Sequence, residues 1–284
     1  MKKTFTLFIF IFCFTAFSND IFVSIPPQKF FVEKIAGSLL NVEVLIKPGQ
    51  NPHSFDLNPG QMIELSKSNI YFTLGLEFED VLIPKISSIN NNLKIIPLDS
   101  GIRKIISENT CNHGHDDFGV EEICEIPKAD PHIWLSPRNV KIISLKIKEA
   151  LENNYPENKE VFQKNYLNFI KEIDNISNQI NTITKNLKSK TFLIYHPAWA
   201  YFARDFDLTQ LSVETDGKEP GPKDIIEIIK KVKQHNIKTI FIEPAQNPQS
   251  PQVIAKQAGL QVKTADPLDE NWSLNIINFA ESLK

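Results

Sequence analysis

Beyond its first eighteen residues, the 284-residue sequence has no apolar run that approaches the roughly 20 residues of a membrane-spanning helix. Direct membrane insertion is therefore not expected, and attachment to a membrane would need a partner. The sequence also lacks an excess of basic residues, with 31 Lys and Arg against 34 Asp and Glu. This balance gives no indication of a nucleic-acid partner, and it does not repel small cations.

The N-terminus has the features of an export signal. Two lysines are followed by an apolar run over residues 5–14 and by small residues at positions 16 and 18. This pattern predicts a signal peptide over residues 1–18 that is removed, and the apolar run is too short for a membrane anchor. Cys13 follows the bulky Phe12, which does not fit a lipoprotein signal. We therefore expect a soluble periplasmic chain from Asn19 to Lys284.

Cysteine is scarce, and only Cys111 and Cys124 would remain after cleavage. An even number of cysteines in an oxidising compartment is compatible with a disulfide that closes a small loop. Two free thiols are the alternative. Twelve residues separate the two cysteines, which is not the short spacing of a zinc knuckle.

Apolar segments of strand length alternate with amphipathic segments of helical period along both halves of the chain. The strands expected in the first half are Ile21–Ile25, Val42–Ile46, Ile70–Leu74 and Leu93–Leu98, and those in the second half are Thr191–Tyr195, Leu208–Val213, Thr239–Ile242 and Gln261–Thr264. The helices expected between and after them are Lys29–Ile35, Gln61–Ser66, Phe78–Ile86, Asn139–Leu151, Ala198–Phe206, Pro222–His235, Pro251–Ala258 and Trp272–Leu283. This alternation predicts an α/β fold in which parallel sheets are flanked by helices.

A long helix is expected between the two halves. From Glu157 to Leu187 no proline or glycine interrupts an apolar pattern with spacings of three and four residues. Such a helix would be roughly 45 Å long at 1.5 Å per residue. The expected organisation is an N-terminal lobe over 19–154, a linking helix over 155–189 and a C-terminal lobe over 190–284. Because the helix should resist hinge opening, we expect local loop movement rather than wide lobe closure.

The periodicity is lost between Gly101 and Asp130, which predicts a surface loop. This loop contains a short cluster of imidazoles and carboxylates, namely His113, His115, Asp116 and Asp117. The cluster is compatible with weak metal scavenging and equally with a solvated loop that has no such role.

Three other histidines lie beside prolines in polar loops far apart in the chain: His53 after Pro52, His132 after Pro131, and His196 before Pro197. Neutral imidazole is a common metal ligand, and distant loops meet where strand ends converge. Three imidazoles leave the charge of a divalent ion uncompensated, so we expect a carboxylate as the fourth ligand. Asp266, just after a predicted strand, is the candidate, although an Asx turn would also explain it.

Glu214 and Glu243 also follow predicted strands. At the edge of a cleft they could orient a ligand histidine through its second nitrogen. Surface carboxylates at strand ends are the alternative explanation for both.

Five motifs in this order resemble the metal-specific solute-binding proteins of bacterial ABC importers. They are Gly49-Gln50-Asn51-Pro52-His53-Ser54-Phe55-Asp56, Asp130-Pro131-His132-Ile133-Trp134-Leu135-Ser136-Pro137, Tyr195-His196-Pro197-Ala198-Trp199-Ala200-Tyr201-Phe202, Gly217-Lys218-Glu219-Pro220 and Asp266-Pro267-Leu268. The resemblance covers essentially the whole chain after residue 18, although the His- and acid-rich loop is shorter than in many zinc-importing members.

The resemblance implies two α/β lobes joined by a rigid helix, with one metal ion held between them for delivery to a membrane permease. By the same resemblance His53 and His132 are ligands from the first lobe, and His196 and Asp266 from the second. In the manganese-preferring members that the chain resembles, the residue at the position matched by His196 is a carboxylate. The histidine here favours Zn²⁺ as the cargo, with Mn²⁺ or iron as alternatives. We expect a monomer that is not an enzyme.

Two other functions are alternatives to metal delivery. A zinc-dependent hydrolase would need an open coordination position and a general base, and the sequence contains no His-Glu-x-x-His motif. A surface adhesin is the third alternative, since some relatives have that role. The absence of a lipidation cysteine favours a periplasmic carrier.

Overall fold

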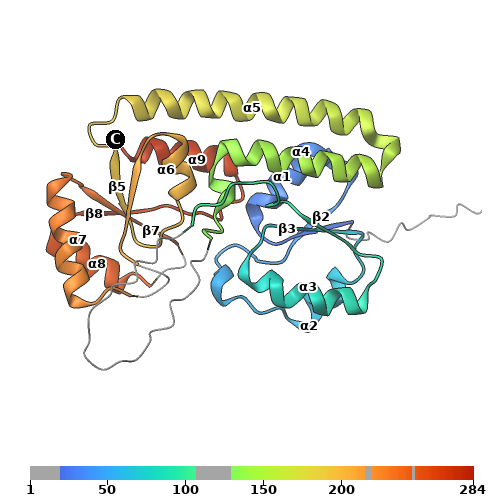
Figure 1. Cartoon of the computed structure of the whole chain (residues 1–284), viewed down its shortest axis with the longest axis horizontal. Helices are drawn as coiled ribbons and strands as arrows, with labels where there is room; N and C mark the ends of the chain where they lie inside the picture. The colour runs from blue at the N-terminus through green and yellow to red at the C-terminus, as the bar shows by residue number, and fades with distance from the viewer. Residues whose placement is uncertain (1–19, 107–128, 215–218, 245–246) are drawn as a thin grey trace, which may run out of the picture.

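The computed structural model describes residues 20–106, 129–214, 219–244 and 247–284 (Figure 1). The predicted signal peptide, the pair Cys111 and Cys124, and the cluster of His113, His115, Asp116 and Asp117 lie outside the described residues. Among the described helices, none combines the length and hydropathy that crossing a membrane requires.

The first lobe is built on a four-stranded parallel sheet with the strand order β2-β1-β3-β4. Its strands are β1 (Ile21–Val23), β2 (Val42–Val44), β3 (Ile70–Thr73) and β4 (Lys94–Pro97). The helices between them are α1 (Pro26–Ala36), α2 (Pro59–Leu65) and α3 (Glu77–Ile89), with the short 3₁₀ turns η1 (Gly37–Leu39) and η2 (Pro52–Ser54). Every residue of β1 and β3 is buried, as expected for central strands covered on both faces.

The second lobe repeats this arrangement with the strand order β6-β5-β7-β8, again parallel. Its strands are β5 (Thr191–Ile194), β6 (Thr209–Ser212), β7 (Thr239–Ile242) and β8 (Gln261–Thr264). The helices are α6 (Ala200–Asp205), α7 (Pro222–Gln234), α8 (Gln249–Ala258) and α9 (Trp272–Ser282). The expectation of two α/β lobes with parallel sheets is confirmed.

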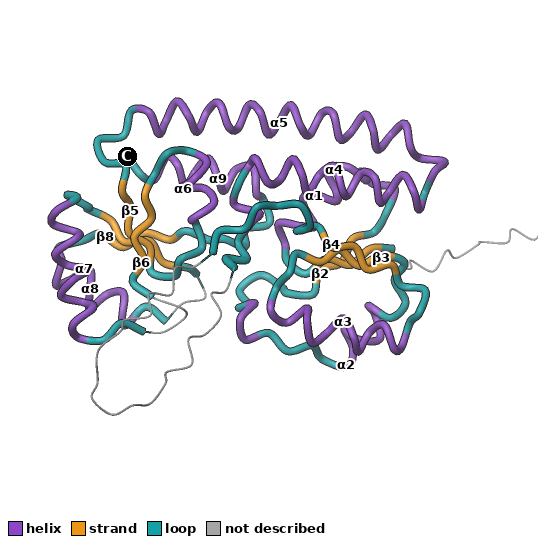
Figure 2. The backbone as a smooth tube through the Cα atoms, in the orientation of Figure 1, coloured by secondary structure: helices purple, strands orange, loops and turns teal. Residues whose placement is uncertain are grey.

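Two helices follow the first sheet, and the second of them runs along both lobes. After the 3₁₀ turn η3 (Ile133–Leu135), helix α4 (Pro137–Asn154) begins at Ser136, whose hydroxyl accepts from the N–H of Asn139. The 3₁₀ turn η4 (Pro156–Asn158) then leads into α5 (Lys159–Lys185), whose 27 residues correspond to roughly 40 Å. Figures 1 and 2 show α5 running along both lobes, above α4 and α9. The long helix predicted from the apolar spacing is confirmed.

One hydrophobic core continues from the first lobe into the second beneath α5. Phe169 on α5 lies 6.1 Å from Phe31 on α1, measured between ring centroids. Phe31 in turn makes an edge contact with Trp272 on α9, at 5.3 Å. The same core includes Phe279 on α9 and Phe241 on β7. Side chains of both lobes therefore share one closely packed interior.

A buried carboxylate anchors the turn between β3 and α3. Glu79 accepts hydrogen bonds from the backbone N–H groups of Leu74, Gly75 and Leu76 at 2.7–3.1 Å, and from the hydroxyl of Ser24. Burial raises the pKa of Glu79 to about 7, although these hydrogen bonds act in the opposite direction. Gly75 has a φ of +76°, which a residue with a side chain rarely adopts. The turn therefore has one defined shape, which matters because Leu76 lines the pocket described below.

Replacement of Glu79 by alanine should lower the free energy of unfolding by about 3 kcal/mol, because three backbone donors would lose their acceptor in a buried turn. Urea unfolding monitored by circular dichroism measures this change. Glu64→Ala, at an exposed position on α2, is the control and should stay within about 0.5 kcal/mol of the parent protein. A loss below about 1 kcal/mol for Glu79→Ala would contradict the anchoring role.

Candidate metal site

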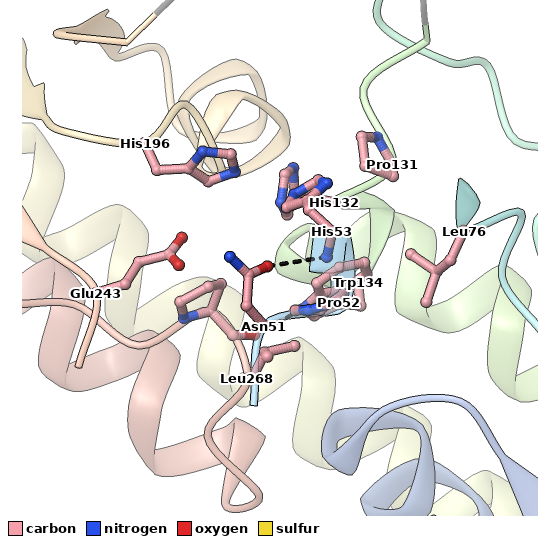
Figure 3. A pocket seen from close by; sticks show the side chains of 11 residues that line it. Asn51, Pro52, His53, Leu76, Pro131, His132, Trp134, His196, Glu243 and Leu268 are labelled. Carbon is pink, nitrogen blue, oxygen red and sulfur yellow. Dashed lines mark hydrogen bonds between the residues drawn. The ribbon is translucent and has the colours of Figure 1, made fainter. Parts of the chain in front are cut away.

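His53 is positioned by a short proline-initiated turn in the first lobe. The 3₁₀ turn η2 has Pro52 at its first position, and the side-chain oxygen of Asn51 accepts from the N–H of His53 at 2.9 Å. Figure 3 shows this hydrogen bond beside the imidazole of His53. His53 is the most exposed of the three predicted histidine ligands. The hydrogen bond from Asn51 therefore holds the backbone of His53 in place.

His132 lies at the start of η3 and is buried, with 6% of its surface exposed. One carboxylate oxygen of Asp130 accepts from the N–H of His132 at 2.8 Å and lies 2.8 Å from its ring atom Nδ1. A carboxylate beside Nδ1 favours the tautomer that carries its proton there, which leaves Nε2 free to bind a metal ion.

His196 follows β5 in the second lobe and has the same kind of support. Its Nδ1 lies 2.9 Å from Oε2 of Glu214, which follows β6. Its Nε2 is buried and has no hydrogen-bond partner among the described residues. A buried imidazole nitrogen without a partner is costly unless something else binds it. The arrangement therefore suits the binding of a metal ion by Nε2 of His196.

The three imidazoles converge at the junction of the lobes (Figure 3). One ring nitrogen from each of His53, His132 and His196 can be chosen so that all three lie within 4.8 Å of one another. The ring centroids are separated by 5.1 Å for His53 and His196, by 5.3 Å for His132 and His196, and by 6.1 Å for His53 and His132. Residues separated by 143 positions in the sequence thus reach a single small volume.

The pocket enclosed by these rings has a volume of about 20 Å³. This is room for an ion or a water molecule, and too little for an organic substrate. Apolar side chains close much of its wall, namely those of Pro52, Leu76, Trp134 and Leu268. Polar ligands within an apolar wall bind a small cation more strongly than they would in open water, because the wall excludes competing solvent.

Two of the three predicted second-lobe carboxylates, Glu243 and Asp266, occupy different places. Glu243, which follows β7, lines the pocket together with the histidines (Figure 3). Asp266 follows β8, and its Oδ1 accepts from the N–H of Leu268 at 2.8 Å. It is not among the residues that line the pocket in the described chain. Its role as the fourth ligand therefore stays a prediction.

The sequence indicated only some of the carboxylates that orient the predicted histidine ligands. Glu214 lies beside the second nitrogen of His196, as expected for one of the two strand-end glutamates. Asp130 was missed in this role, although the Asp-Pro-His spacing was visible and places an Asx-type acceptor two residues before the imidazole. Glu243 lines the pocket itself. Its position after a strand was compatible both with this place and with a role in orienting a histidine, so the sequence did not distinguish the two.

The electrostatics of the histidines differ. Enclosure of its ring, reinforced by the neighbouring imidazoles of His132 and His196, lowers the pKa of His53 to about 4. Burial alone would also lower the pKa of His196, but the hydrogen bond to Glu214 and the negative charges of Glu243 and Glu214 outweigh it, so that the pKa is raised. Burial raises the pKa of Glu243, although the nearby His196 and His132 act in the opposite direction.

Comparison with known proteins gives consistent matches over almost the whole chain. Residues 21–278 match the family model described as the zinc-uptake complex component A, periplasmic. The chain is 27% identical over 263 residues to a putative metal-binding protein of Chlamydia trachomatis, covering 92% of this chain and 89% of that one. It is 26% identical over 287 residues to the high-affinity zinc uptake system protein ZnuA of Yersinia pestis, covering 95% and 90%.

Solved structures show the same similarity. A crystal structure of ZnuA is 33% identical to this chain and superimposes with a TM-score of 0.84, covering 94% of this chain and 98% of that one. A zinc-bound deletion mutant of ZnuA gives the same identity and TM-score, with 94% and 96% covered.

Removal of either supporting carboxylate, by Asp130→Ala or Glu214→Ala, should lower the affinity for Zn²⁺ by about 10- to 100-fold, because the imidazole beside it loses its fixed tautomer and orientation. Competition with a chromogenic zinc chelator measures the affinity, and circular dichroism verifies that each variant is folded. Glu227→Ala, at an exposed position on α7, is the control and should leave the affinity unchanged. Equal affinities for all three variants would show that the two carboxylates do not orient the ligands.

Proposed function

This chain belongs to the family of the periplasmic component A of zinc-uptake complexes, and on that basis we propose that it captures a zinc ion between its two lobes and delivers it to an ABC-type importer. Members of this family are solute-binding proteins and not enzymes. The zinc ion is thus the cargo of the protein, and release to the membrane permease completes its function.

The observation that carries the proposal is the convergence of His53, His132 and His196, contributed by both lobes, with ligand atoms within 4.8 Å of one another. Nitrogen ligands suit Zn²⁺, whereas Mn²⁺ favours sites richer in oxygen. A set of three imidazoles therefore favours zinc over manganese as the cargo. The pocket of about 20 Å³ is the size of an ion or a water molecule, which suits the capture of a metal ion.

The ligand set that we propose is His53, His132, His196 and Asp266. The support for Asp266 is its place after β8, at the strand ends from which His196 and Glu243 also come. Glu243 is a second candidate for the fourth position, favoured by its place in the pocket wall. Either carboxylate would bring a negative charge to a site whose other ligands are neutral, which lowers the cost of holding a divalent ion away from water.

The proposal includes the state in which the protein acts. Export by a cleaved signal peptide over residues 1–18 would bring it outside the cytoplasmic membrane, where members of the family act. We propose that it works there as a monomer with an N-terminal lobe over 19–154, a linking helix over 155–189 and a C-terminal lobe over 190–284. The continuous core beneath α5 supports capture and release by movement of the ligand loops rather than of whole lobes.

Titration of the protein with zinc, in competition with manganese, tests the cargo. We expect one zinc ion per chain and preference for zinc over manganese. His132→Ala and His196→Ala should each weaken zinc binding by at least about 100-fold, because an imidazole bond to the ion is lost and the cavity admits water. His235→Ala, an exposed histidine at the end of α7, is the matched control. An unchanged affinity in the two pocket variants would disprove the site.

The same titration of Asp266→Asn and Glu243→Gln separates the two candidates for the fourth ligand. The substitution that removes the ligand should weaken zinc binding by more than about tenfold, and the other should have a smaller effect. A larger loss for Glu243→Gln would replace Asp266 by Glu243 in the ligand set.

Zinc affinity should fall as the pH decreases from the neutral range, because only a neutral imidazole binds metal and the pKa of His196 is raised above 6.5. Below that raised pKa, one competing proton lowers the affinity by about tenfold per pH unit. His53, with a pKa of about 4, adds no competing proton until the pH approaches 4. Calorimetric titrations between pH 8 and 5 measure the slope. In Glu214→Gln the fall should begin at lower pH, and a flat profile in the parent protein would remove His196 from the site.

A further inference from the structure

Two indole N–H groups join the lobes directly at the metal pocket. The indole N–H of Trp134, in the first lobe, donates to the carbonyl of Pro267 in the second lobe at 2.7 Å. The indole N–H of Trp272, the first residue of α9, donates to the carbonyl of Trp134 at 2.7 Å. Trp134 is therefore both a donor to the second lobe and an acceptor from it. We call the group of Trp134, Pro267 and Trp272 the indole bridge.

The indole bridge lies in the interior, where its hydrogen bonds do not compete with water. Trp134 is 1% exposed, Trp272 is fully buried, and Pro267 is buried as well. A buried hydrogen bond of this kind is costly to break, because the carbonyl that loses its donor finds no solvent to replace it. The bridge consequently restricts how far the two lobes can separate at this point.

The bridge also contributes to the pocket wall from both lobes, through Trp134 of the first and Pro267 of the second. The ring of Trp134 packs against the imidazole of His132, with 5.2 Å between the ring centroids. Trp134, Pro267 and Leu268 all line the pocket. Asp266 immediately precedes Pro267, and its own carbonyl accepts from the side chain of Asn275 on α9. One residue thus connects a first-lobe ligand to the loop that carries the second-lobe carboxylate.

We propose that Trp134 is a positioning residue for the metal site: its N–H bond to Pro267 fixes the distance between the His132 loop and the loop over residues 266–268. This inference rests on the proposed function, because it concerns the same site. Helix α5 runs along both lobes above α4 and α9 (Figure 1). The indole bridge holds them at the pocket itself, so that the ligands of both lobes are already close before an ion arrives. Such preorganisation slows release, because the ligands cannot move apart without breaking a buried hydrogen bond.

The chain offers a matched pair of tryptophans for the test. Trp134→Phe and Trp199→Phe remove the same atoms from a buried aromatic side chain. The indole N–H of Trp199, however, is buried without a hydrogen-bond partner among the described residues, and Trp199 does not line the pocket. Trp199 instead stacks on Phe279 within the second lobe, with 3.6 Å between the ring centroids. Loss of packing is thus common to both variants, and loss of the bond between the lobes belongs to Trp134→Phe alone.

The first measurement needs no metal. Cysteines introduced at Val81 of α3 and Ile226 of α7, which are 60% and 68% exposed, carry the spin labels. Pulsed electron paramagnetic resonance then measures the distance between the two labels, one on each lobe. Cys111 and Cys124 are replaced by serine in all samples. We expect the distance distribution to widen about twofold in Trp134→Phe and to stay at the parent width in Trp199→Phe. Equal widths in the two variants would overturn the proposal, whether or not the protein binds zinc.

The second measurement is the rate of zinc dissociation into excess chelator, monitored by stopped flow. We expect dissociation about tenfold faster in Trp134→Phe and within twofold of the parent in Trp199→Phe, even where both variants melt at lower temperature. If the two rates change equally, Trp134 has only a structural role and the proposal fails. Failure of the proposed function is distinct, since the parent protein itself would then bind no zinc.

Discussion

The metal pocket depends on the fixed separation of two α/β lobes that share one hydrophobic core. Phe31, Phe169 and Trp272 connect α1, α5 and α9 in a single packed cluster that includes residues of both lobes. Close packing transmits the position of one element to the next. In this structure His53 and His132 from the first lobe lie close to His196 from the second, with ring centroids 5.1 and 5.3 Å from that of His196.

Within this frame, the orientation of each imidazole follows from local chemistry. Asp130 and Glu214 hold the Nδ1 atoms of His132 and His196, and Asn51 holds the backbone of His53. His53 is the most exposed of the three residues, and its pKa is lowered where that of His196 is raised. The site therefore combines two imidazoles held by carboxylates with a third histidine that is more exposed to solvent. This combination suits a protein that must bind an ion and later release it.

Much of the fold could be predicted because its signals are local. Apolar strands between helical segments indicated both parallel sheets, and the spacing of Phe169, Ile173 and Ile176 indicated the long helix. Boundaries were less accurate. Helix α1 begins at Pro26 rather than Lys29, because proline is tolerated in the first turn, where its missing N–H has no intrahelical partner.

The site was predictable in its histidines and less so in its carboxylates. Proline-flanked histidines at strand ends are a strong local pattern, and the structure brings all three together. Glu214, Glu243 and Asp266 each follow a strand, and the sequence does not distinguish an oxygen that faces the pocket from one that holds an imidazole or caps a turn. The difference depends on the direction of each side chain and on the register of β6, β7 and β8, which are set by tertiary packing.

X-ray absorption at the zinc edge of the loaded protein tests the central claim most directly, because it counts the atoms bound to the ion. The account predicts a four-coordinate shell of three imidazole nitrogens and one carboxylate oxygen at about 2.0–2.1 Å, with the multiple scattering typical of imidazole rings. A shell with sulfur at about 2.3 Å, or one of six oxygens without imidazole scattering, would contradict it.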